Sequence, residues 1–330
     1  MDTKRYINMV ILDDFQNYFS EIERDERLPD KIKITVYKNH FKNSNDLINK
    51  LKDSEIIVGI RERTKFPKEI INQLPKLRLL ITTGARNASF DLEASTNNNI
   101  VVCGTPGGGE GPVDLTWGLI LSLTRKIHEE DKLVREGQWG KNIGPSLDGK
   151  ILGLLGLGHI GKLVSKVGLA FGMNVISWSE NLSDIYAEKF GVKYVDKQTL
   201  LKESDILSIH TKLSSRTENI IGEDEINLMK TNSYIVNTSR GPIINEKALV
   251  NALNSKRIAG AAIDTFDIEP LPSNHPLLYT PNTLLTPHIG YVTYEAYEAY
   301  YEGIIDNVIS FLNDNPIRVL NPDVLKKLYD

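Results

Sequence analysis

The sequence predicts an α/β protein built from two doubly wound parallel-sheet domains, and three features support this prediction. Short, nearly continuous apolar stretches alternate with helical stretches, a pattern typical of parallel strands that helices cover on both faces. The alternation runs in two series, and a segment rich in Gly, Pro and polar residues at 141–150 separates them. The length of 330 residues also exceeds the usual size of one hydrophobic core, which favours two domains.

The first series contains two expected helices and five expected strands. One helix is expected at 44–54, and a second at 66–74 has Pro67 near its first turn, where proline is tolerated. The strands are expected at 8–12, 33–37, 55–60, 77–82 and 99–103.

A long helical pattern follows at 110–136. Its first half is apolar on nearly all sides, so we expect it to be buried between domains or between subunits. The tail has tyrosines at 291, 294, 297, 300 and 301, a helical spacing that favours core or interface packing over cofactor contact. The second series of strands is expected at 150–156, 174–178, 192–195, 205–210, 233–238, 260–266 and 283–286.

Composition and charge exclude several kinds of partner. The chain is 41% hydrophobic and 25% charged, which is ordinary for a soluble globular protein. Its net charge of −4 gives no electrostatic reason to expect nucleic acid or an anionic membrane. The apolar run near the N-terminus is too short for a signal sequence or a membrane span. A single cysteine, Cys103, cannot form an internal disulfide, so we expect a cytoplasmic protein with Cys103 as a small buried residue.

A glycine motif follows the first strand of the second series. Gly156, Gly158 and Gly161 have G-x-G-x-x-G spacing between a strand and a helix, the context in which this motif binds a dinucleotide. Gly156 permits the tight turn, Gly158 lets a pyrophosphate approach the backbone, and Gly161 allows close helix–strand packing. The helix N-terminus, with His159 and Ile160, favours the anion. A tight turn that binds nothing is the weaker interpretation.

An acidic residue that binds the adenosine ribose and selects NAD over NADP is expected about 20 residues further on, at the end of the next strand. Ser179 stands at that position, and Glu180 follows it. Glu180 could reach the ribose 2′-hydroxyl and would repel a 2′-phosphate, and no Arg or Lys follows closely to bind one. These features favour NAD without excluding NADP, and a solvated surface role for Glu180 stays open.

Three unlike polar residues each follow an expected strand of the second series. They are Arg240, Glu269 and His288. In an open parallel sheet, ligands bind beyond the carboxyl ends of the strands. Each residue alone has an ordinary explanation, as a surface charge, a turn residue before proline, or a loop histidine. Their common position beside a nucleotide site favours a shared functional role.

These side chains suit hydride transfer between a nicotinamide cofactor and an alcohol carbon. The hydroxyl proton needs an acid–base group, and histidine suits this task because its unperturbed pKa lies near neutrality. A carboxylate beside His288 would orient the ring and favour the imidazolium form. The planar guanidinium of Arg240 matches a carboxylate, so it could hold a 2-oxo or 2-hydroxy acid.

The stretches "GLGHIG", "NTSRGPIINEKALVNAL", "GAAIDTFDIEPLP" and "PNTLLTPHIG" together resemble the D-isomer-specific 2-hydroxyacid dehydrogenases. The resemblance covers nearly the whole chain and is strongest over residues 149–290. It implies that His288 is the acid/base, that Glu269 pairs with it, and that Arg240 binds the substrate carboxylate. It also implies that Asp264 contacts the nicotinamide carboxamide. Further cofactor contacts are expected from Leu213, Thr217, Thr238, Ser239 and Gly290.

The same resemblance implies an architecture. A Rossmann dinucleotide-binding domain at 105–293 is inserted into a flavodoxin-like substrate domain made of residues 1–104 and 294–330. The cleft between the domains would close over substrate, with a hinge at 104–114 whose glycines fit a moving element. The helix near 110–130 would build a two-fold homodimer.

Two loops depart from the family's pattern. "TTGARNASFD" at 82–91 resembles the family's glycine-rich loop, whose backbone N–H groups hold the substrate carboxylate. Ala85 and Arg86 take the contact positions there, and Arg86 stands where glycine is common. The Arg86 side chain could add a second cation at the substrate or point to solvent. "IHTKLSSRT" at 209–217 resembles the loop along the cofactor, which usually has proline where Lys212 stands.

The sequence therefore predicts an NAD(P)-dependent reductase of a small 2-oxo acid that acts on the D-2-hydroxy acid in reverse, with no metal. Glu269 argues against the formate dehydrogenase branch, which has glutamine there. The absence of residues beyond 330 argues against an appended regulatory domain like those of some phosphoglycerate dehydrogenases. A short D-3-phosphoglycerate dehydrogenase stays open, as do glyoxylate and hydroxypyruvate as substrates. An NAD(H)-sensing corepressor-like binding protein is a second alternative, disfavoured because long tails are lacking. If the domain bound another nucleotide, the common position of Arg240, Glu269 and His288 would be a coincidence.

Overall fold

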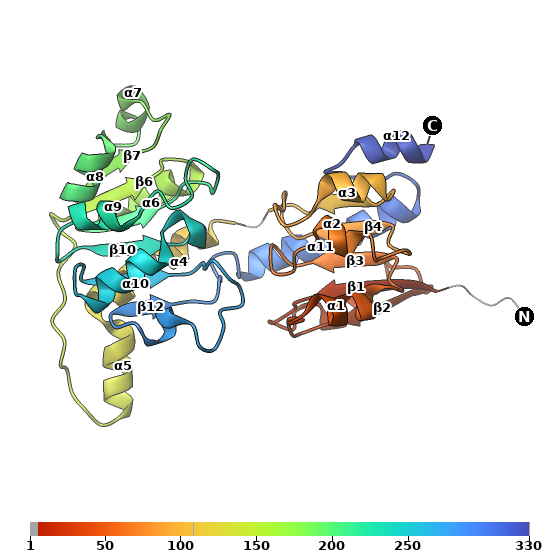
Figure 1. Cartoon of the computed structure of the whole chain (residues 1–330), viewed down its shortest axis with the longest axis horizontal. Coiled ribbons are helices and arrows are strands. Elements are labelled where there is room, and N and C mark those ends of the chain that lie inside the picture. The colour runs from red at the N-terminus through yellow and green to blue at the C-terminus, as the bar shows by residue number, and fades with distance from the viewer. Residues whose placement is uncertain (1–5, 108, 330) are drawn as a thin grey trace, which may run out of the picture. The chain divides into compact units, whose positions relative to one another are not determined.

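The computed structural model describes residues 6–107 and 109–329, and contacts divide the chain into two compact units. Unit 1 is Met1–Gly109 with Val292–Asp330, and unit 2 is Glu110–Tyr291. Each unit contains one parallel sheet with helices around it (Figure 1), so the predicted α/β fold class is confirmed. Gly108, which belongs to the predicted hinge, lies outside the described residues.

The sheet of unit 1 has the strand order β2-β1-β3-β4-β5, and every neighbouring pair is parallel. This is the doubly wound order of flavodoxin-like folds, with its switch point between β1 and β3. The strands β3, β4 and β5 are buried throughout, as expected when helices cover both faces of a sheet. The strands are β1 Ile7–Leu12, β2 Ile32–Val36, β3 Ile56–Gly59, β4 Leu79–Thr82 and β5 Val101–Gly104.

Helices from both ends of unit 1's sequence pack on its sheet. One apolar cluster joins sheet residues to α1, α2 and α3. The tail contributes α11, in which Tyr297 and Tyr300 are buried and Tyr294 is exposed, so the aromatic spacing does reflect core packing. Cys103 is fully buried, as predicted. These helices are α1 Ser44–Leu51, α2 Lys68–Ile71, α3 Leu92–Asn97, α11 Tyr294–Leu312 and α12 Asp323–Tyr329, with a 3₁₀ turn at Phe19–Arg24.

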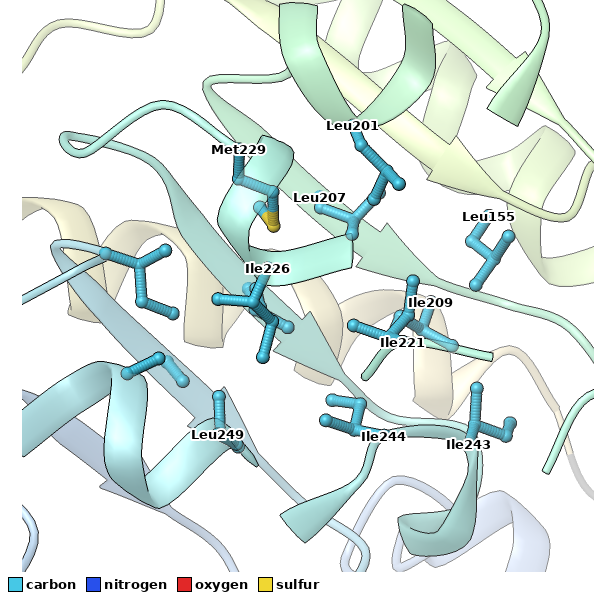
Figure 2. Packing of buried hydrophobic residues seen from close by; sticks show 14 of the residues in the cluster. Leu155, Leu201, Leu207, Ile209, Ile221, Ile226, Met229, Ile243, Ile244 and Leu249 are labelled. Carbon is cyan, nitrogen blue, oxygen red and sulfur yellow. The ribbon is translucent and has the colours of Figure 1, made fainter. Parts of the chain in front are cut away.

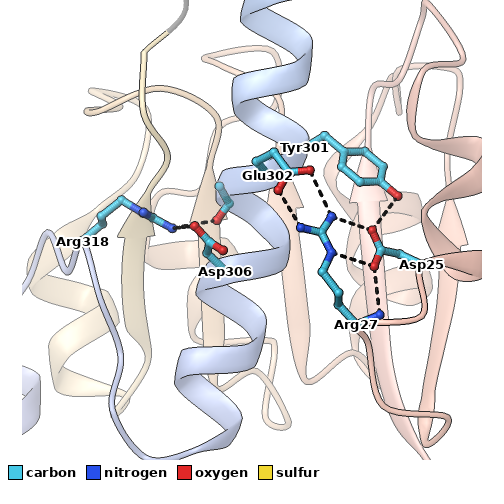
Figure 3. Close-up of polar contacts among 7 residues, drawn as sticks. Asp25, Arg27, Tyr301, Glu302, Asp306 and Arg318 are labelled. Carbon is cyan, nitrogen blue, oxygen red and sulfur yellow. Dashed lines mark hydrogen bonds and ion pairs between the residues drawn. The ribbon is translucent and has the colours of Figure 1, made fainter.

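A network of charged side chains fastens α11 to the loop before β2 (Figure 3). The guanidinium of Arg27 donates to both carboxylate oxygens of Asp25, at 2.9 and 2.7 Å, and to Glu302 at 2.6 Å. Tyr301 also donates to Asp25, at 3.1 Å. The hydrogen bonds from Arg27 lower the pKa of Asp25 to about 2. Asp25 is therefore ionised in the folded protein well below the pH at which it would be protonated in the unfolded chain.

We expect Asp25→Asn to lower the thermal unfolding temperature by about 2 °C at neutral pH, because it removes the charge that Arg27 binds. The folded-state pKa is depressed, so this stabilisation is present above about pH 4 and is lost as the pH falls toward about 2. Thermal melts of both proteins across this range should converge at the acid end. Asp30→Asn, an exposed acid on the same segment, is the control and should change the unfolding temperature little. A difference that persisted at pH 2 would contradict this account.

The sheet of unit 2 has the order β12-β11-β10-β9-β6-β7-β8, again with every pair parallel. The chain starts in the middle at β6, winds to one edge through β7 and β8, and then returns through β9 to the other edge. This is the Rossmann order extended by one strand, and its switch point lies between β6 and β9. The strands are β6 Ile151–Leu155, β7 Asn174–Trp178, β8 Lys193–Tyr194, β9 Ile206–Ile209, β10 Tyr234–Asn237, β11 Gly260–Ile263 and β12 Thr283–Leu285.

Helices cover both faces of this sheet. On one face, alternate strand residues such as Leu155, Leu207 and Ile209 pack with side chains of α8, α9 and α10 (Figure 2). On the other face, Leu152 and Leu154 pack with α4 and α6. The period-2 alternation of strand side chains explains this division. The helices are α4 Gly111–Arg125, α6 His159–Ala170, α7 Asp184–Glu188, α8 Lys197–Glu203, α9 Glu223–Leu228 and α10 Glu246–Asn254, with 3₁₀ turns at Gly241–Ile243 and Pro276–Tyr279.

The prediction of one continuous helix at 110–136 is wrong. The pattern forms two helices, α4 and α5 (Ile127–Arg135), because Lys126 adopts a left-handed conformation with φ of 56°. A left-handed residue ends the hydrogen-bond pattern of the preceding helix. The apolar first half is buried as expected, but within unit 2, against α6, β10 and β11. No residue of α5 is buried. No helix in the described part of the chain is long and apolar enough to cross a membrane.

Candidate active site

The glycine motif forms the turn from β6 into α6 at the switch point of unit 2. Gly156 has φ of 104°, a left-handed conformation that favours glycine. Gly161 packs so closely that a Cβ atom there would lie 2.3 Å from the carbonyl oxygen of Gly156. Gly158 caps α6, and a Cβ atom there would meet nothing within 4 Å. The backbone is thus tightly packed at Gly161 and has open space beside it at Gly158. This open space fits a pyrophosphate lying against the backbone.

A pocket of about 710 Å³ lies over this turn, within the size range of ligand sites. Its walls are formed by the turn itself, by the residues after β7, by the loop after β9 and by the residues after β10. Arg240 lines it, as do ten predicted cofactor residues: Gly156, Gly158, His159, Ile160, Ser179, Glu180, Leu213, Thr217, Thr238 and Ser239. The predicted residues Gly161, Asp264 and Gly290 do not line it.

The turn after β10 fixes Arg240. The buried side chain of Asn237 donates to the Arg240 carbonyl at 2.9 Å and accepts from the Ser239 N–H at 3.0 Å. The guanidinium also donates to the Ser239 carbonyl at 2.7 Å. An internally bonded turn therefore presents Arg240 to the pocket. Sequence reasoning did not assign this supporting role to Asn237.

The next residue, Gly241, brings the Arg240 turn against the loop that carries Glu269. A Cβ atom on Gly241 would lie 2.2 Å from the carbonyl carbon of Phe266 and 2.6 Å from the backbone nitrogen of Asp267. Backbone atoms cannot move aside as the end of a flexible side chain can. The two loops are therefore in direct backbone contact, and only glycine permits it.

We expect Gly241→Ala to lower the thermal unfolding temperature by about 5 °C, because the added methyl group must push these backbones apart. Gly118→Ala is the matched control, since Gly118 is an exposed position of α4 with nothing within 4 Å of an added Cβ. That control should be neutral or slightly stabilising, because alanine favours helix over glycine. Equal unfolding temperatures for Gly241→Ala and the parent would contradict the packing described.

His288 and Glu269 form a hydrogen-bonded pair. His288 Nδ1 lies 2.7 Å from Glu269 Oε2, and both side chains are largely covered. The other oxygen, Oε1, accepts the backbone N–H of Phe266 at 2.9 Å, which fixes the carboxylate. Within the described residues, His288 Nε2 has no hydrogen-bond partner. The pair therefore holds the imidazole by one nitrogen and leaves the other for a ligand.

The backbone of His288 is itself unusual. Its φ of 52° lies in the left-handed region, which is uncommon for residues other than glycine. The Tyr291 ring packs edge-on against the imidazole, with ring centroids 5.3 Å apart. Strained backbone of this kind persists where surrounding contacts over-determine it, and it is frequent at functional sites.

Asp264 forms contacts that fix the backbone of the loop that holds His288. Its fully buried carboxylate accepts from the Thr286 hydroxyl at 2.6 Å and from the N–H groups of Ile289 and Gly290 at 2.8 and 3.0 Å. Burial raises the pKa of Asp264, while these three donors and the nearby His288 oppose the rise. Asp264 thus ties the end of β11 to the loop that holds His288.

The loop at 209–217, which the family resemblance placed along the cofactor, brings to the pocket three residues to which the sequence analysis gave no role. His210 lines it, and burial lowers its pKa to about 4, so its ring is neutral near pH 7. Lys212 and Arg216 also line it with exposed side chains, and neither forms an ion pair with the rest of the described chain. Lys212 and Arg216 lie on the loop after β9. This loop reaches the pocket because β9 pairs with β6, the strand that leads into the glycine turn. No group of three or more His, Cys, Asp or Glu among the residues described could hold a metal ion.

The other predicted substrate residues, Ala85 and Arg86, lie in unit 1, on the loop that follows β4. Asn87 fixes this loop, because its side chain donates to the Arg61 carbonyl at 2.7 Å and to the Thr82 hydroxyl at 2.9 Å. Both Ala85 and Arg86 are exposed, and the described residues provide no ion-pair partner for Arg86. The loop therefore displays one unpaired guanidinium at the carboxyl edge of the unit 1 sheet.

Comparison with known proteins identifies the family. The model of the NAD-binding domain of D-isomer specific 2-hydroxyacid dehydrogenases matches residues 117–290. The glyoxylate reductase of Thermococcus litoralis is 37% identical over 290 residues, which are 84% of this chain and 87% of that protein. The D-3-phosphoglycerate dehydrogenase of Methanocaldococcus jannaschii is 39% identical over 258 residues, but these are only 49% of its length and 77% of this chain.

A solved structure gives the same result over nearly the full length. The phosphoglycerate oxidoreductase of Vibrio cholerae matches with a TM-score of 0.88 and 32% identity, covering 93% of this chain and 99% of that one. The chain therefore belongs to the D-isomer-specific 2-hydroxyacid dehydrogenase family, as the sequence motifs predicted. It is a 2-hydroxyacid dehydrogenase that uses a nicotinamide dinucleotide.

Proposed function

We propose that this dehydrogenase interconverts a small 2-oxo acid and its D-2-hydroxy acid, with His288 as acid/base, Glu269 as its partner and Arg240 binding the substrate carboxylate. The His288–Glu269 hydrogen bond of 2.7 Å is the observation that carries the proposal. The pair stands on loops after β12 and β11, and Gly241 joins the Glu269 loop to the Arg240 turn. Relatives named glyoxylate reductase, such as the protein of Thermococcus litoralis, support a small 2-oxo acid as the substrate.

Each side chain has one task in the reduction. A bound nicotinamide supplies the hydride that reaches the carbonyl carbon. His288 Nε2 donates the proton that the carbonyl oxygen takes up, so the oxo group becomes a hydroxyl group. Glu269 accepts the hydrogen bond from Nδ1 and thereby fixes the ring and stabilises the imidazolium before transfer. Arg240 holds the substrate carboxylate through paired N–H donors and orients the carbonyl.

We propose NAD as the preferred cofactor. The glycine turn and the N-terminus of α6 would hold the pyrophosphate, and Glu180 would accept a hydrogen bond from the ribose 2′-hydroxyl. Ser179, beside it, is neutral and adds no repulsion. Asp264 would accept from the carboxamide of the nicotinamide, which requires one of its oxygens to serve both the loop and the cofactor.

We also propose that Ala85 and Arg86 contact the substrate. The backbone at Ala85 would donate to the carboxylate, and the unpaired guanidinium of Arg86 would favour a 2-oxo acid with a second anionic group. A short D-3-phosphoglycerate dehydrogenase is the alternative that this cation supports. Phosphoglycerate enzymes among the relatives are consistent with it.

A panel of 2-oxo acids assayed with NADH and with NADPH tests these proposals. Glyoxylate, pyruvate, hydroxypyruvate and 3-phosphohydroxypyruvate should be included, with the chirality of the chiral products determined. We expect oxidation of NADH with at least one of them and a D-2-hydroxy acid as product. An L product, or NADH binding without turnover on any member, would overturn the proposal. Binding without turnover is the result expected of a corepressor-like sensor.

We further propose a homodimer. On α5 and the segment after it, four large apolar side chains are exposed: Ile127, Val134, Trp139 and Ile143. Apolar surface of this kind is usually covered in an assembly. Sedimentation should show a particle of twice the chain mass, and a monomer at micromolar concentration would contradict the proposal.

A further inference from the structure

We propose that Lys212 and Arg216 offset the charge of Glu180 in the dinucleotide pocket, so that this protein binds NADPH as well as NADH, with only a modest preference for NADH. The inference rests on the proposed cofactor site. Sequence reasoning found no cation near Glu180 because it considered only the residues that follow directly. In the folded protein the two cations come from another loop and line the same pocket.

Sheet order explains this convergence. The strands β9, β6 and β7 are neighbours, and β6 is in the middle. The loop after β9 and the residues after β7 therefore flank the glycine turn from its two sides. Lys212 and Arg216 stand on the first of these segments and Glu180 on the second. A ligand lying across the glycine turn meets both.

The loop after β9 is closed on itself. The Thr217 hydroxyl donates to the Lys212 carbonyl at 2.6 Å and accepts the Ser214 N–H at 2.8 Å. The Ser239 hydroxyl also donates to the Thr211 carbonyl, which joins the loop to the turn after β10. Lys212 and Arg216 thus extend from a compact turn of fixed position. Their long side chains are free to reach an anion in the pocket.

The charged side chains that line the pocket have a net positive charge, which favours the binding of an additional phosphate. Among its described lining residues, Glu180 is the only acid, against the cations Lys212, Arg216 and Arg240. His210 is neutral because burial lowers its pKa to about 4, and His159 stands at the N-terminus of α6.

The backbone of the glycine turn and the helix N-terminus already provide for the pyrophosphate that NADH and NADPH share. Arg240 is assigned to the substrate carboxylate. Lys212 and Arg216 therefore remain as cations for the phosphate that only NADPH carries. That phosphate brings a charge of about −1.5 to −2 near neutral pH.

Calorimetric titration with ADP-ribose and 2′-phospho-ADP-ribose tests the proposal, because these two probes differ only in the 2′-phosphate and need no turnover. We expect the parent protein to bind both, with dissociation constants within about tenfold of each other. Replacing both cations, in Lys212→Ala/Arg216→Ala, should weaken 2′-phospho-ADP-ribose by about tenfold and ADP-ribose by less than about twofold. The loss should shrink as salt is added.

Two further variants complete the design. Lys166→Ala/Lys189→Ala removes the same charge from exposed positions that do not line the pocket, and should leave the ratio of the two dissociation constants unchanged. Glu180→Gln should shift the ratio toward 2′-phospho-ADP-ribose. Equal weakening of both probes in the Lys212/Arg216 variant would assign the cations to the pyrophosphate and overturn the inference, as would no change. Failure of the parent to bind either probe would instead overturn the proposed cofactor site.

Discussion

Replacing His288 with alanine is expected to lower kcat for 2-oxo acid reduction by at least about a thousandfold, while the dissociation constant for NADH stays within about twofold. The structure explains this separation. His288 stands on the loop after β12 and is held by Glu269 at 2.7 Å, whereas the glycine turn that would bind the pyrophosphate follows β6. Steady-state kinetics would measure the first effect, and quenching of protein fluorescence by NADH the second.

His128→Ala provides the matched control for this variant. His128 is a partly exposed histidine of α5, and it does not line the pocket. Its removal should leave kcat within about twofold of the parent value. If His288→Ala kept a tenth or more of the parent kcat, His288 would not be the acid/base. If it lost NADH binding as well, the loss of turnover would say nothing about proton transfer.

The second large effect is expected from Arg240→Lys, which should raise KM for the 2-oxo acid by about thirtyfold or more and change kcat less. A lysine keeps the positive charge but offers a point charge in place of two parallel donors, and charge-assisted hydrogen bonds of this kind contribute about 1.5 to 3 kcal/mol. The turn that presents Arg240 is held by Asn237, at 2.9 Å to the Arg240 carbonyl, so the backbone should survive the substitution.

Kinetics with glyoxylate over a wide concentration range would measure this effect. Arg125→Lys, at an exposed arginine of α4, is the control and should leave KM unchanged. A KM for Arg240→Lys equal to that of the parent would contradict carboxylate binding by Arg240. A loss confined to kcat would point instead to an interaction made only in the transition state.

Much of the fold could be predicted because parallel sheets leave a clear trace in sequence. The twelve expected strands all occur, since buried strands need continuous apolar residues and the helices between them need amphipathic ones. The glycine turn was equally readable, because φ of 104° at Gly156 and the contact at Gly161 both require glycine. The division of strands between two sheets matched the two series in the sequence.

Other features depend on contacts between distant segments, which no local pattern encodes. Lys126 breaks the long helix through its backbone conformation, although lysine is a good helix former. The family resemblance placed the loop of Lys212 and Arg216 along the cofactor, but these cations share a pocket with Glu180 only because β9 pairs with β6, about 50 residues away in sequence. The role of Asp264 in holding the His288 loop likewise needed the pairing of β11 with β12. The sequence predicted that Arg240, Glu269 and His288 lie at one edge of the sheet. The contacts that hold their loops were visible only in the structure.

The central claim is that Glu269 holds His288 as the proton donor for carbonyl reduction, and a double-mutant cycle of Glu269→Gln and His288→Ala tests it most directly. Glu269→Gln alone should lower kcat by about tenfold or more, because the carboxylate that orients the imidazole through the 2.7 Å hydrogen bond is lost. The same substitution in the His288→Ala background should change the residual kcat by less than about twofold, since the side chain that Glu269 positions is absent. Equal losses of kcat in the two backgrounds would contradict the claim.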